Sequence, residues 1–145
     1  MSEKIYESYS SEETFAIGKE IGENAQGGDI YCLSGDLGVG KTVFSKGLAK
    51  GLDINEEVNS PTFTIIQEYD DGRLPFYHFD VYRLADSYEM DELGYEEYFY
   101  GEGVTLIEWA GIVEDIIPNN AIWITIEKDL DKGLDYRKIT IKYKD

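Results

Sequence analysis

The sequence predicts an α/β fold in which a central mixed, mainly parallel sheet lies between two layers of helices. Two observations predict it. The first is a short apolar run, Ile30–Leu33, that leads into a glycine-rich loop at 35–40 and then into a segment with helical spacing. A buried strand, a loop and a helix in this order are typical of parallel α/β sheets. The second is the alternation of further short apolar runs with helical segments along the rest of the chain, the pattern of helices packed on a sheet.

The first half of the chain contains the expected central strand and two helices. Ser10 and Glu13 have the spacing of a capping box, and apolar residues follow at helical intervals, so a helix is expected over about 12–25. Two glycines directly after it end the helix. The run at 30–33 is the expected central strand, and a second helix is expected from 41 to about 52.

The second half adds a hairpin, two more helices and three more strands. The runs Phe63–Tyr69 and Leu74–Tyr82 are rich in β-branched and aromatic residues and are separated by the turn-forming segment Asp70–Arg73. We therefore expect an antiparallel hairpin. The remaining expected elements are a helix at Asp91–Tyr100, a buried strand at Val104–Ile107, a helix at Trp109–Ile117 that Pro118 ends, and closing strands at Ile122–Ile126 and Ile139–Tyr143.

Length, charge and cysteine content restrict the class of protein. A chain of 145 residues has the length of one domain, so we expect residues 1–145 to form a single unit. Thirty acidic residues against thirteen basic ones give a formal net charge of −17, and the resulting field repels phosphate backbones and anionic lipids. The single cysteine, Cys32, has no partner for an internal disulfide, and the sequence shows neither a secretory leader nor an apolar run of about 18 residues. We expect a cytoplasmic protein that binds neither membranes nor bare nucleic acid.

The segment Gly35–Thr42, GDLGVGKT, carries the clearest chemical signal. It fits the pattern G-x-x-x-x-G-K-[ST] and lies between the expected strand and the expected helix, where a phosphate-binding P-loop has to lie. Glycines there let backbone N–H groups turn inward around the phosphates, Lys41 reaches the β and γ oxygens, and the Thr42 hydroxyl ligates Mg²⁺. The sequence therefore predicts a P-loop NTPase-like three-layer sandwich that binds a nucleoside triphosphate with Mg²⁺.

An acidic residue is expected beside the P-loop, at the end of a neighbouring buried strand, where its carboxylate holds the metal directly or through water. Two residues qualify, because Asp80 ends the run FYHFD and Glu108 ends the run VTLIE. The approach to Glu108 is the longer and more uniformly apolar, but the sequence leaves open which acid positions the attacking water. His78 lies between two large aromatic residues and is expected to make an orienting hydrogen bond.

The choice of nucleotide and reaction is restricted by what the sequence lacks. The N-K-x-D string that recognises guanine does not occur, which favours ATP, and no arginine-bearing lid of the kind a metabolite kinase needs is evident, which favours water as the acceptor. Thr62, in the segment Ser60–Thr62 after the P-loop helix, is a candidate for sensing the γ-phosphate. Two alternatives stay open, a small-molecule kinase and a non-catalytic adaptor gated by ATP.

Four segments, GDLGVGKT, NSPTFT, HFDVYRL and IEWA, occur in this order, and together they strongly resemble the TsaE (YjeE) family of small bacterial ATPases. The resemblance extends from Ser11 to Arg137. It implies an Mg-dependent ATPase that takes part in forming N6-threonylcarbamoyladenosine in tRNA. It also implies that the chain binds the TsaD and TsaB proteins, reaches tRNA only indirectly through that complex, and hydrolyses ATP slowly until these partners stimulate it.

The resemblance also implies roles for individual residues of this chain. Around the phosphates it places Gly38, Val39, Gly40, Lys41, Thr42 and Val43. It implies catalytic roles for Lys41, Asp80 and Glu108, and magnesium ligation by Thr42 with Glu108. It places Ser11 and Thr14 near the adenine, Thr62 in a switch-like position, and either Lys132 or Arg137 at a basic contact near the C-terminus.

Overall fold

The computed structural model describes residues 2–36, 38–59, 65–84 and 86–143. In chain order the strands and helices are β1 (Ser2–Ser8), α1 (Ser11–Asn24), β2 (Ile30–Ser34), α2 (Lys41–Gly51), β3 (Ile66–Tyr69), β4 (Phe76–Asp80), α3 (Tyr88–Leu93), α4 (Tyr95–Phe99), β5 (Val104–Glu108), the 3-10 helix η1 (Ala110–Ile116), β6 (Ile122–Lys128), the 3-10 helix η2 (Leu130–Lys132) and β7 (Arg137–Tyr143).

The strands form one mixed sheet in the order β1-β7-β6-β2-β5-β4-β3. The central strands β6, β2, β5 and β4 are parallel to their neighbours within this group. Antiparallel strands complete both edges, with β7 and β1 on one side and β3 on the other. The parallel centre and the antiparallel β3–β4 hairpin confirm the predicted mixed sheet.

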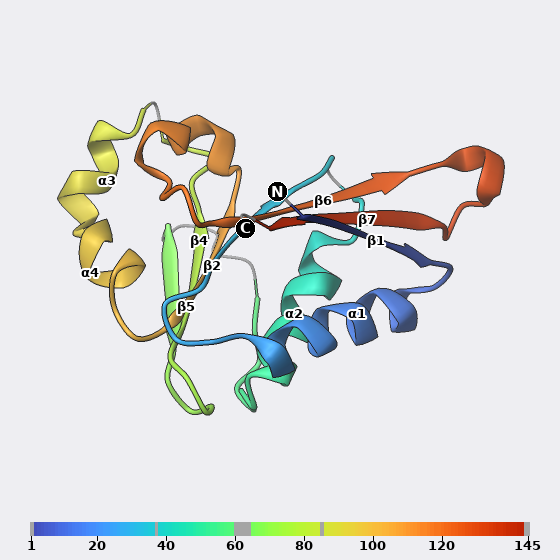
Figure 1. The fold of residues 1–145 in the computed structure, drawn as a ribbon, viewed down its shortest axis with the longest axis horizontal. Coiled ribbons are helices and arrows are strands. Elements are labelled where there is room, and N and C mark those ends of the chain that lie inside the picture. Colours follow the sequence, from blue (N-terminus) through green and yellow to red (C-terminus); the bar gives the residue numbers. More distant parts are fainter. Residues whose placement is uncertain (1, 37, 60–64, 85, 144–145) are drawn as a thin grey trace.

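Helices cover the two faces of this sheet. Figure 1 shows α1 and α2 against one face and α3, α4 and η1 on the other. Within β2, Tyr31 and Leu33 pack into the core that contains the α2 residues, whereas Ile30 and Cys32 pack into the core beneath α3 and α4. Burial on both faces explains why β2 is a continuous apolar run. The predicted three-layer sandwich is confirmed, and among the described residues no helix is long and apolar enough to cross a bilayer.

The helices α1 and α2 approach each other backbone to backbone through glycines. A Cβ atom added at Gly22 of α1 would lie 2.1 Å from the carbonyl oxygen of Leu48, and one at Gly47 of α2 would lie 2.2 Å from that of Phe15. Arg73 stabilises the end of α1 from outside, because its Nη2 atom donates to the carbonyl of Gly22 at 2.6 Å and to two neighbouring carbonyls. This close packing fixes the start of α2, which follows the glycine loop.

Two of the predicted helices are wrong in detail. The single helix expected at Asp91–Tyr100 is two short helices, α3 and α4, because Gly94 between them has φ 69° and cannot continue a right-handed helix. The helix expected at Trp109–Ile117 is the 3-10 helix η1, whose regular geometry is broken at Val113. Both segments lie on the same face of the sheet.

The two ends of the chain form an edge that the sequence pattern did not predict. The first residues, Ser2–Ser8, pair antiparallel with β7 over seven residues. The closing strands are also longer than expected, since β6 runs to Lys128 and β7 begins at Arg137. The β4 strand is shorter than the expected run, and the expected start of its partner at Phe63 lies outside the described residues.

We predict that Gly22→Ala destabilises the protein although alanine favours helices. The added methyl group meets the backbone of α2, which cannot move aside without separating the helices. The expected loss is about 1–3 kcal/mol in the free energy of unfolding, measured by urea denaturation. Gly111→Ala is the matched control, because a Cβ there meets no described atom within 4 Å. A loss of similar size in both variants would contradict the close-contact explanation.

Candidate functional site

The glycine loop joins the carboxyl end of β2 to the first residue of α2. Gly38 has φ 76° and Gly40 has φ 107°, both in the left-handed region that other residues rarely adopt. The Val39 N–H donates to the Asp36 carbonyl at 3.3 Å inside the loop. Thr42, the second residue of α2, is exposed beside the loop. The backbone of this loop therefore requires the glycines that the motif supplies.

Lys41 lies inside the site rather than in solvent. It is the first residue of α2 and is only 8 % exposed. Its Nζ atom lies 4.5 Å from the ring centre of Trp109, a distance typical of a cation–π contact. Trp109 adopts φ 64° directly after β5, and its ring packs against Tyr82 with ring centres 4.8 Å apart. The left-handed turn after β5 thus brings an aromatic face to the P-loop lysine.

The two candidate acids lie side by side. Asp80 and Glu108 are the last residues of β4 and β5, and the parallel register pairs them directly. Glu108 is 4 % exposed, whereas Asp80 is half-buried. The Oδ1 atom of Asp80 accepts a hydrogen bond of 3.1 Å from the Tyr82 N–H. Both acids predicted from the sequence therefore belong to one site.

Burial and the neighbouring charge act on the Asp80 carboxyl. Desolvation is the main cause that raises the pKa of Asp80 above its ordinary value, and the negative charge of Glu108 adds to the increase. The hydrogen bond from Tyr82 and the positive charge of Lys41 act in the opposite direction. The net result is a carboxylate whose ionised form is less favourable in the folded protein than in the unfolded chain.

His78 is the hydrogen-bond partner of the buried Glu108 carboxyl group. The imidazole is fully buried on β4, and its Nε2 atom lies 2.7 Å from Oε2 of Glu108. The sequence predicted an orienting hydrogen bond from this histidine but did not identify its partner. Two-residue alternation along β4 places His78 and Asp80 on the same face of the sheet, toward α2. The H-x-D spacing was the signal that could have linked them.

A small hollow lies beside Val39 of the glycine loop. Its volume is about 40 Å³, and its lining combines the start of α1, the loop, the start of α2 and the start of β7. The lining residues are Ser10, Ser11, Thr14, Val39, Val43, Asp135 and Arg137. Arg137 donates from Nε to the Val39 carbonyl at 2.7 Å, which attaches β7 to the loop. The structure therefore places Ser11, Thr14 and Arg137 together.

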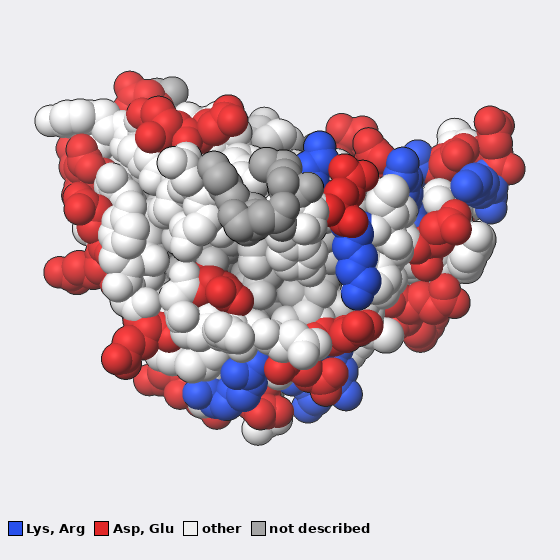
Figure 2. Space-filling model, in the orientation of Figure 1, with Lys and Arg blue, Asp and Glu red and all other residues white. Residues whose placement is uncertain are grey.

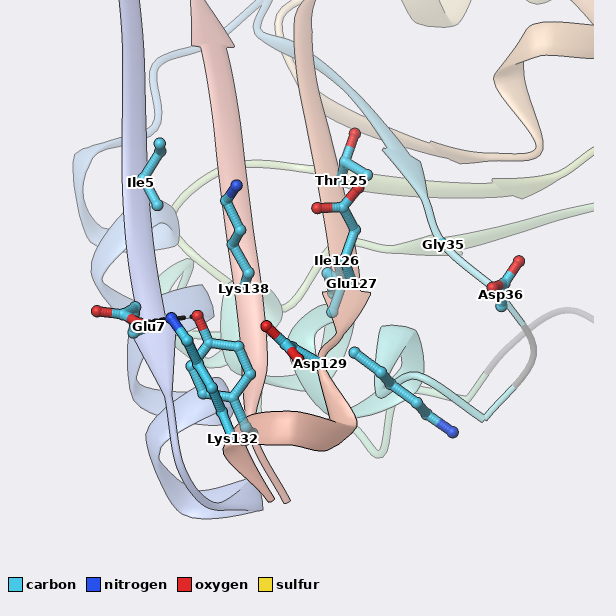
Figure 3. Close-up of a pocket in the computed structure, with 12 residues that line it drawn as sticks. Ile5, Glu7, Gly35, Asp36, Thr125, Ile126, Glu127, Asp129, Lys132 and Lys138 are labelled. Carbon is cyan, nitrogen blue, oxygen red and sulfur yellow. Dashed lines mark hydrogen bonds and ion pairs between the residues drawn. The ribbon is translucent and has the colours of Figure 1, made fainter. Parts of the chain in front are cut away.

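Lys132 lies in a different place. Its Nζ atom makes an ion pair of 3.3 Å with Glu7, which also accepts a hydrogen bond of 2.8 Å from the Tyr136 hydroxyl. These residues line a larger open groove of about 700 Å³ that runs along β6 and the ends of β1 and β7 and reaches Gly35 and Asp36 of the glycine loop (Figure 3). Each of the two basic residues left open by the sequence lines a hollow that includes part of the P-loop, and Arg137 is the one that makes a hydrogen bond to it, at Val39. The predicted switch residue, Thr62, lies outside the described residues.

A comparison with protein families shows which family this chain belongs to. The model of the family described as "Threonylcarbamoyl adenosine biosynthesis protein TsaE" matches residues 8–139. The chain belongs to the TsaE family. Its TsaE relatives include the tRNA threonylcarbamoyladenosine biosynthesis protein TsaE of Bacillus subtilis, 49 % identical over 140 residues that cover 97 % of this chain and 85 % of the relative. The TsaE protein of Treponema pallidum is 41 % identical over 134 residues, covering 92 % and 96 %.

A solved structure supports the same relationship. The crystal structure of YdiB from Bacillus subtilis superposes with a TM-score of 0.82 at 42 % sequence identity, covering 98 % of this chain and 86 % of that one. Because the superposition covers nearly all of this chain, the two proteins share the arrangement of the whole sheet and its helices. The fold of this TsaE-family member therefore agrees with that of an experimentally determined relative.

We predict that Asp80→Asn stabilises the metal-free protein at neutral pH. Because the folded pKa of Asp80 is raised, its stabilising contribution is present below the ordinary value of 3.8 and is lost as the pH rises through the folded pKa. Asparagine carries no charge and keeps an oxygen for the Tyr82 N–H. The expected rise in Tm is about 1–2 °C at pH 7, measured by thermal denaturation in EDTA.

Measuring the Tm of Asp80→Asn and of the wild type at acid pH tests whether the charge of Asp80 causes the difference in stability. Below about pH 3.8 the aspartate is protonated in both states, so the difference in Tm between the variant and the wild type should vanish. A variant that is less stable than the wild type at neutral pH would show that Tyr82 and Lys41 favour the charged carboxylate more than burial disfavours it.

Proposed function

We propose that this chain is the ATP-hydrolysing subunit required for tRNA N6-threonylcarbamoyladenosine formation, and that it acts on the TsaD–TsaB transferase complex rather than on tRNA directly. The observation that carries the proposal is the convergence of Lys41, Asp80 and Glu108 at the carboxyl edge of the parallel strands, in a member of the TsaE family. The names of the curated relatives state the same biosynthetic process.

The phosphates of ATP would lie over the glycine loop. Backbone N–H groups of Gly38–Val43 and the amino end of α2 supply partial positive charge there, and Lys41 supplies a full charge. The ammonium group of Lys41 is already buried against Trp109, so little solvent has to be displaced when it contacts the β and γ oxygens. Ser11, Thr14, Val43 and Arg137 line the small hollow beside Val39, which is too small to enclose a nucleoside, and we propose that the adenosine of ATP contacts its rim.

The residues at the edge of the sheet fit a magnesium ion. Mg²⁺ prefers oxygen ligands, and Thr42 and Glu108 offer a hydroxyl and a carboxylate beside the loop. Burial, and to a smaller extent the charge of Glu108, raise the pKa of Asp80, and a divalent cation would stabilise the two adjacent carboxylates. When bound, the ion would supply positive charge to the β and γ phosphates. We propose Thr42 and Glu108 as its protein ligands.

Hydrolysis then depends on what the chain's own groups do to ATP and water. Lys41 and the loop N–H groups stabilise the charge that develops on the phosphate oxygens as the bond to the γ-phosphorus breaks. Asp80 or Glu108 accepts a hydrogen bond from the attacking water and orients it. Asp80 is the more exposed of the two, and its raised pKa brings it closer to that of a general base than an ordinary aspartate.

Other features support a reaction completed by partner proteins. The chain has three arginines, and two of them bind backbone carbonyls, Arg73 at the end of α1 and Arg137 at Val39. Arginine is the usual group that stabilises the transferring phosphoryl charge. Figure 2 shows acidic side chains spread around the visible face, with basic groups in smaller clusters. With a net charge of −17, this surface favours leaving the tRNA contacts to TsaD and TsaB.

The proposed function is tested by measuring ATP hydrolysis by the isolated chain and after addition of TsaD and TsaB. We expect a slow basal rate, strong stimulation by the partners, and a loss of about a hundredfold or more in the stimulated rate for Lys41→Ala and for Glu108→Ala. Lys50→Ala is the matched control, because this lysine is exposed at the opposite end of α2. ATP binding without stimulated hydrolysis would instead favour an adaptor gated by ATP, and phosphorylation of a metabolite would favour a kinase.

The assignment of the adenosine end predicts different effects for two basic residues. Arg137→Ala should weaken ATP binding by about tenfold, because it removes a charged donor from the hollow and from the Val39 carbonyl. Lys132→Ala should change the dissociation constant by less than about twofold, since it removes an exposed ion pair with Glu7 and a cation–π contact with Tyr136, neither of which involves the glycine loop. Titration calorimetry with ATP measures both. The opposite ranking would move the basic contact to Lys132.

A further inference from the structure

The buried pair formed by His78 and Glu108 has a geometry that a simple packing role does not require. Glu108 ends β5 at the edge of the sheet, and His78 lies on β4 opposite Leu106, so the two side chains are diagonal neighbours on one face. Nε2 of His78 and Oε2 of Glu108 are 2.7 Å apart, and both residues are almost completely buried. This is a short hydrogen bond inside the core.

The chemistry of the pair fixes where the hydrogen lies. A carboxylate that binds a metal ion only accepts hydrogen bonds, so in that role Glu108 requires Nε2 of His78 to donate. The other ring nitrogen, Nδ1, is buried and has no hydrogen-bond partner among the described residues. The hydrogen bond to Glu108 is therefore the one described polar contact of this ring, and Nε2 is the atom that makes it.

The plane of the imidazole is also held. The rings of Phe76 and His78 are stacked with centres 6.0 Å apart and planes 25° apart, and Tyr69 stacks on Phe76 at 5.8 Å with the same angle. These three aromatic residues come from the antiparallel pair β3 and β4. A ring restrained in this way donates its hydrogen in one direction only. Its hydrogen bond can therefore orient the carboxylate that receives it.

We propose that His78 is the positioning residue for the metal-binding carboxylate of Glu108. Its Nε2–H would hold Oε2 of Glu108 at the end of β5, next to Asp80, and leave the second carboxylate oxygen for the ion. This inference rests on the proposed function, because it assigns Glu108 to the magnesium ion. It also explains the H-x-D spacing, since two-residue alternation puts the orienting histidine and the second acid on the same face of β4.

Binding of Mn²⁺ to the full chain saturated with ADP, followed by electron paramagnetic resonance, tests the proposal. His78→Leu removes the donor with little change in volume, and we expect the dissociation constant for Mn²⁺ to rise by about tenfold or more. His78→Gln keeps an amide N–H near the position of Nε2 and should remain within about threefold of the wild type. ADP affinity in EDTA should be the same in all three proteins. A folded His78→Leu variant with wild-type Mn²⁺ affinity would overturn the proposal.

A second measurement does not depend on any variant. His78 is the only histidine in the chain, so nitrogen NMR of protein labelled at histidine reports on this ring alone. We expect a hydrogen on Nε2 in the metal-free protein. A ring that carries its only hydrogen on Nδ1 would refute the arrangement even if His78→Leu failed to fold.

The outcomes separate this inference from the proposed function. If the protein hydrolyses ATP but His78→Leu binds Mn²⁺ normally, the role of His78 fails and the ATPase remains. If the variants differ in Mn²⁺ affinity as expected but no hydrolysis occurs with TsaD and TsaB, the positioning role stands and the ATPase fails. If the nucleotide-bound wild type takes up no Mn²⁺, both proposals fail.

Discussion

The parallel pairing of β2, β5 and β4 is the constraint on which the candidate site depends. Because these strands run in the same direction and in a defined register, the end of β2 enters the glycine loop while β5 and β4 end in Glu108 and Asp80. Three groups that are far apart in the sequence therefore meet at one edge of the sheet. A shift of one residue in β4 would turn both His78 and Asp80 toward the opposite face.

Packing on both faces of the sheet secures this register. On one face the glycine contacts between α1 and α2 hold the start of α2 near the loop, so that Lys41 is buried beside the acids. On the other face α3, α4 and η1 cover the apolar residues of the same strands. The register is thus stabilised by two separate cores, because a slip would expose apolar residues and bury polar ones on both sides at once.

The site combines features that are unfavourable for folding with features that offset them. Two carboxylates lie side by side, which contributes to the raised pKa of Asp80. The hydrogen bond from His78, the Tyr82 N–H and the positive charge of Lys41 partly offset this cost. Trp109 adopts a left-handed conformation that is unusual for a large residue, and it thereby reaches Lys41. Such local strain and like-charge contacts are typical of functional sites rather than of structural ones.

The sequence by itself determined the elements whose chemistry is local. The glycine loop is recognisable because its backbone needs glycines at left-handed positions, and β2 because burial on both faces requires a continuous apolar run. The motif spacings were also sufficient to identify the family. Other features depended on partners distant in the chain. The N-terminal strand β1 has mixed polarity and forms only because β7 offers it an edge, and the helix expected at Asp91–Tyr100 is broken by the conformation of Gly94.

Tertiary structure also decided the relations within the site. Only the register of β4 and β5 showed that Asp80 and Glu108 are direct neighbours, and only the side-chain contacts showed that His78 is the partner of Glu108. Only the folding of the β6–β7 hairpin showed that Arg137 binds the Val39 carbonyl of the glycine loop, whereas Lys132 pairs with Glu7. Sequence patterns report the local conformation and burial of each segment, whereas contacts between segments depend on strand order and register, which no single segment encodes.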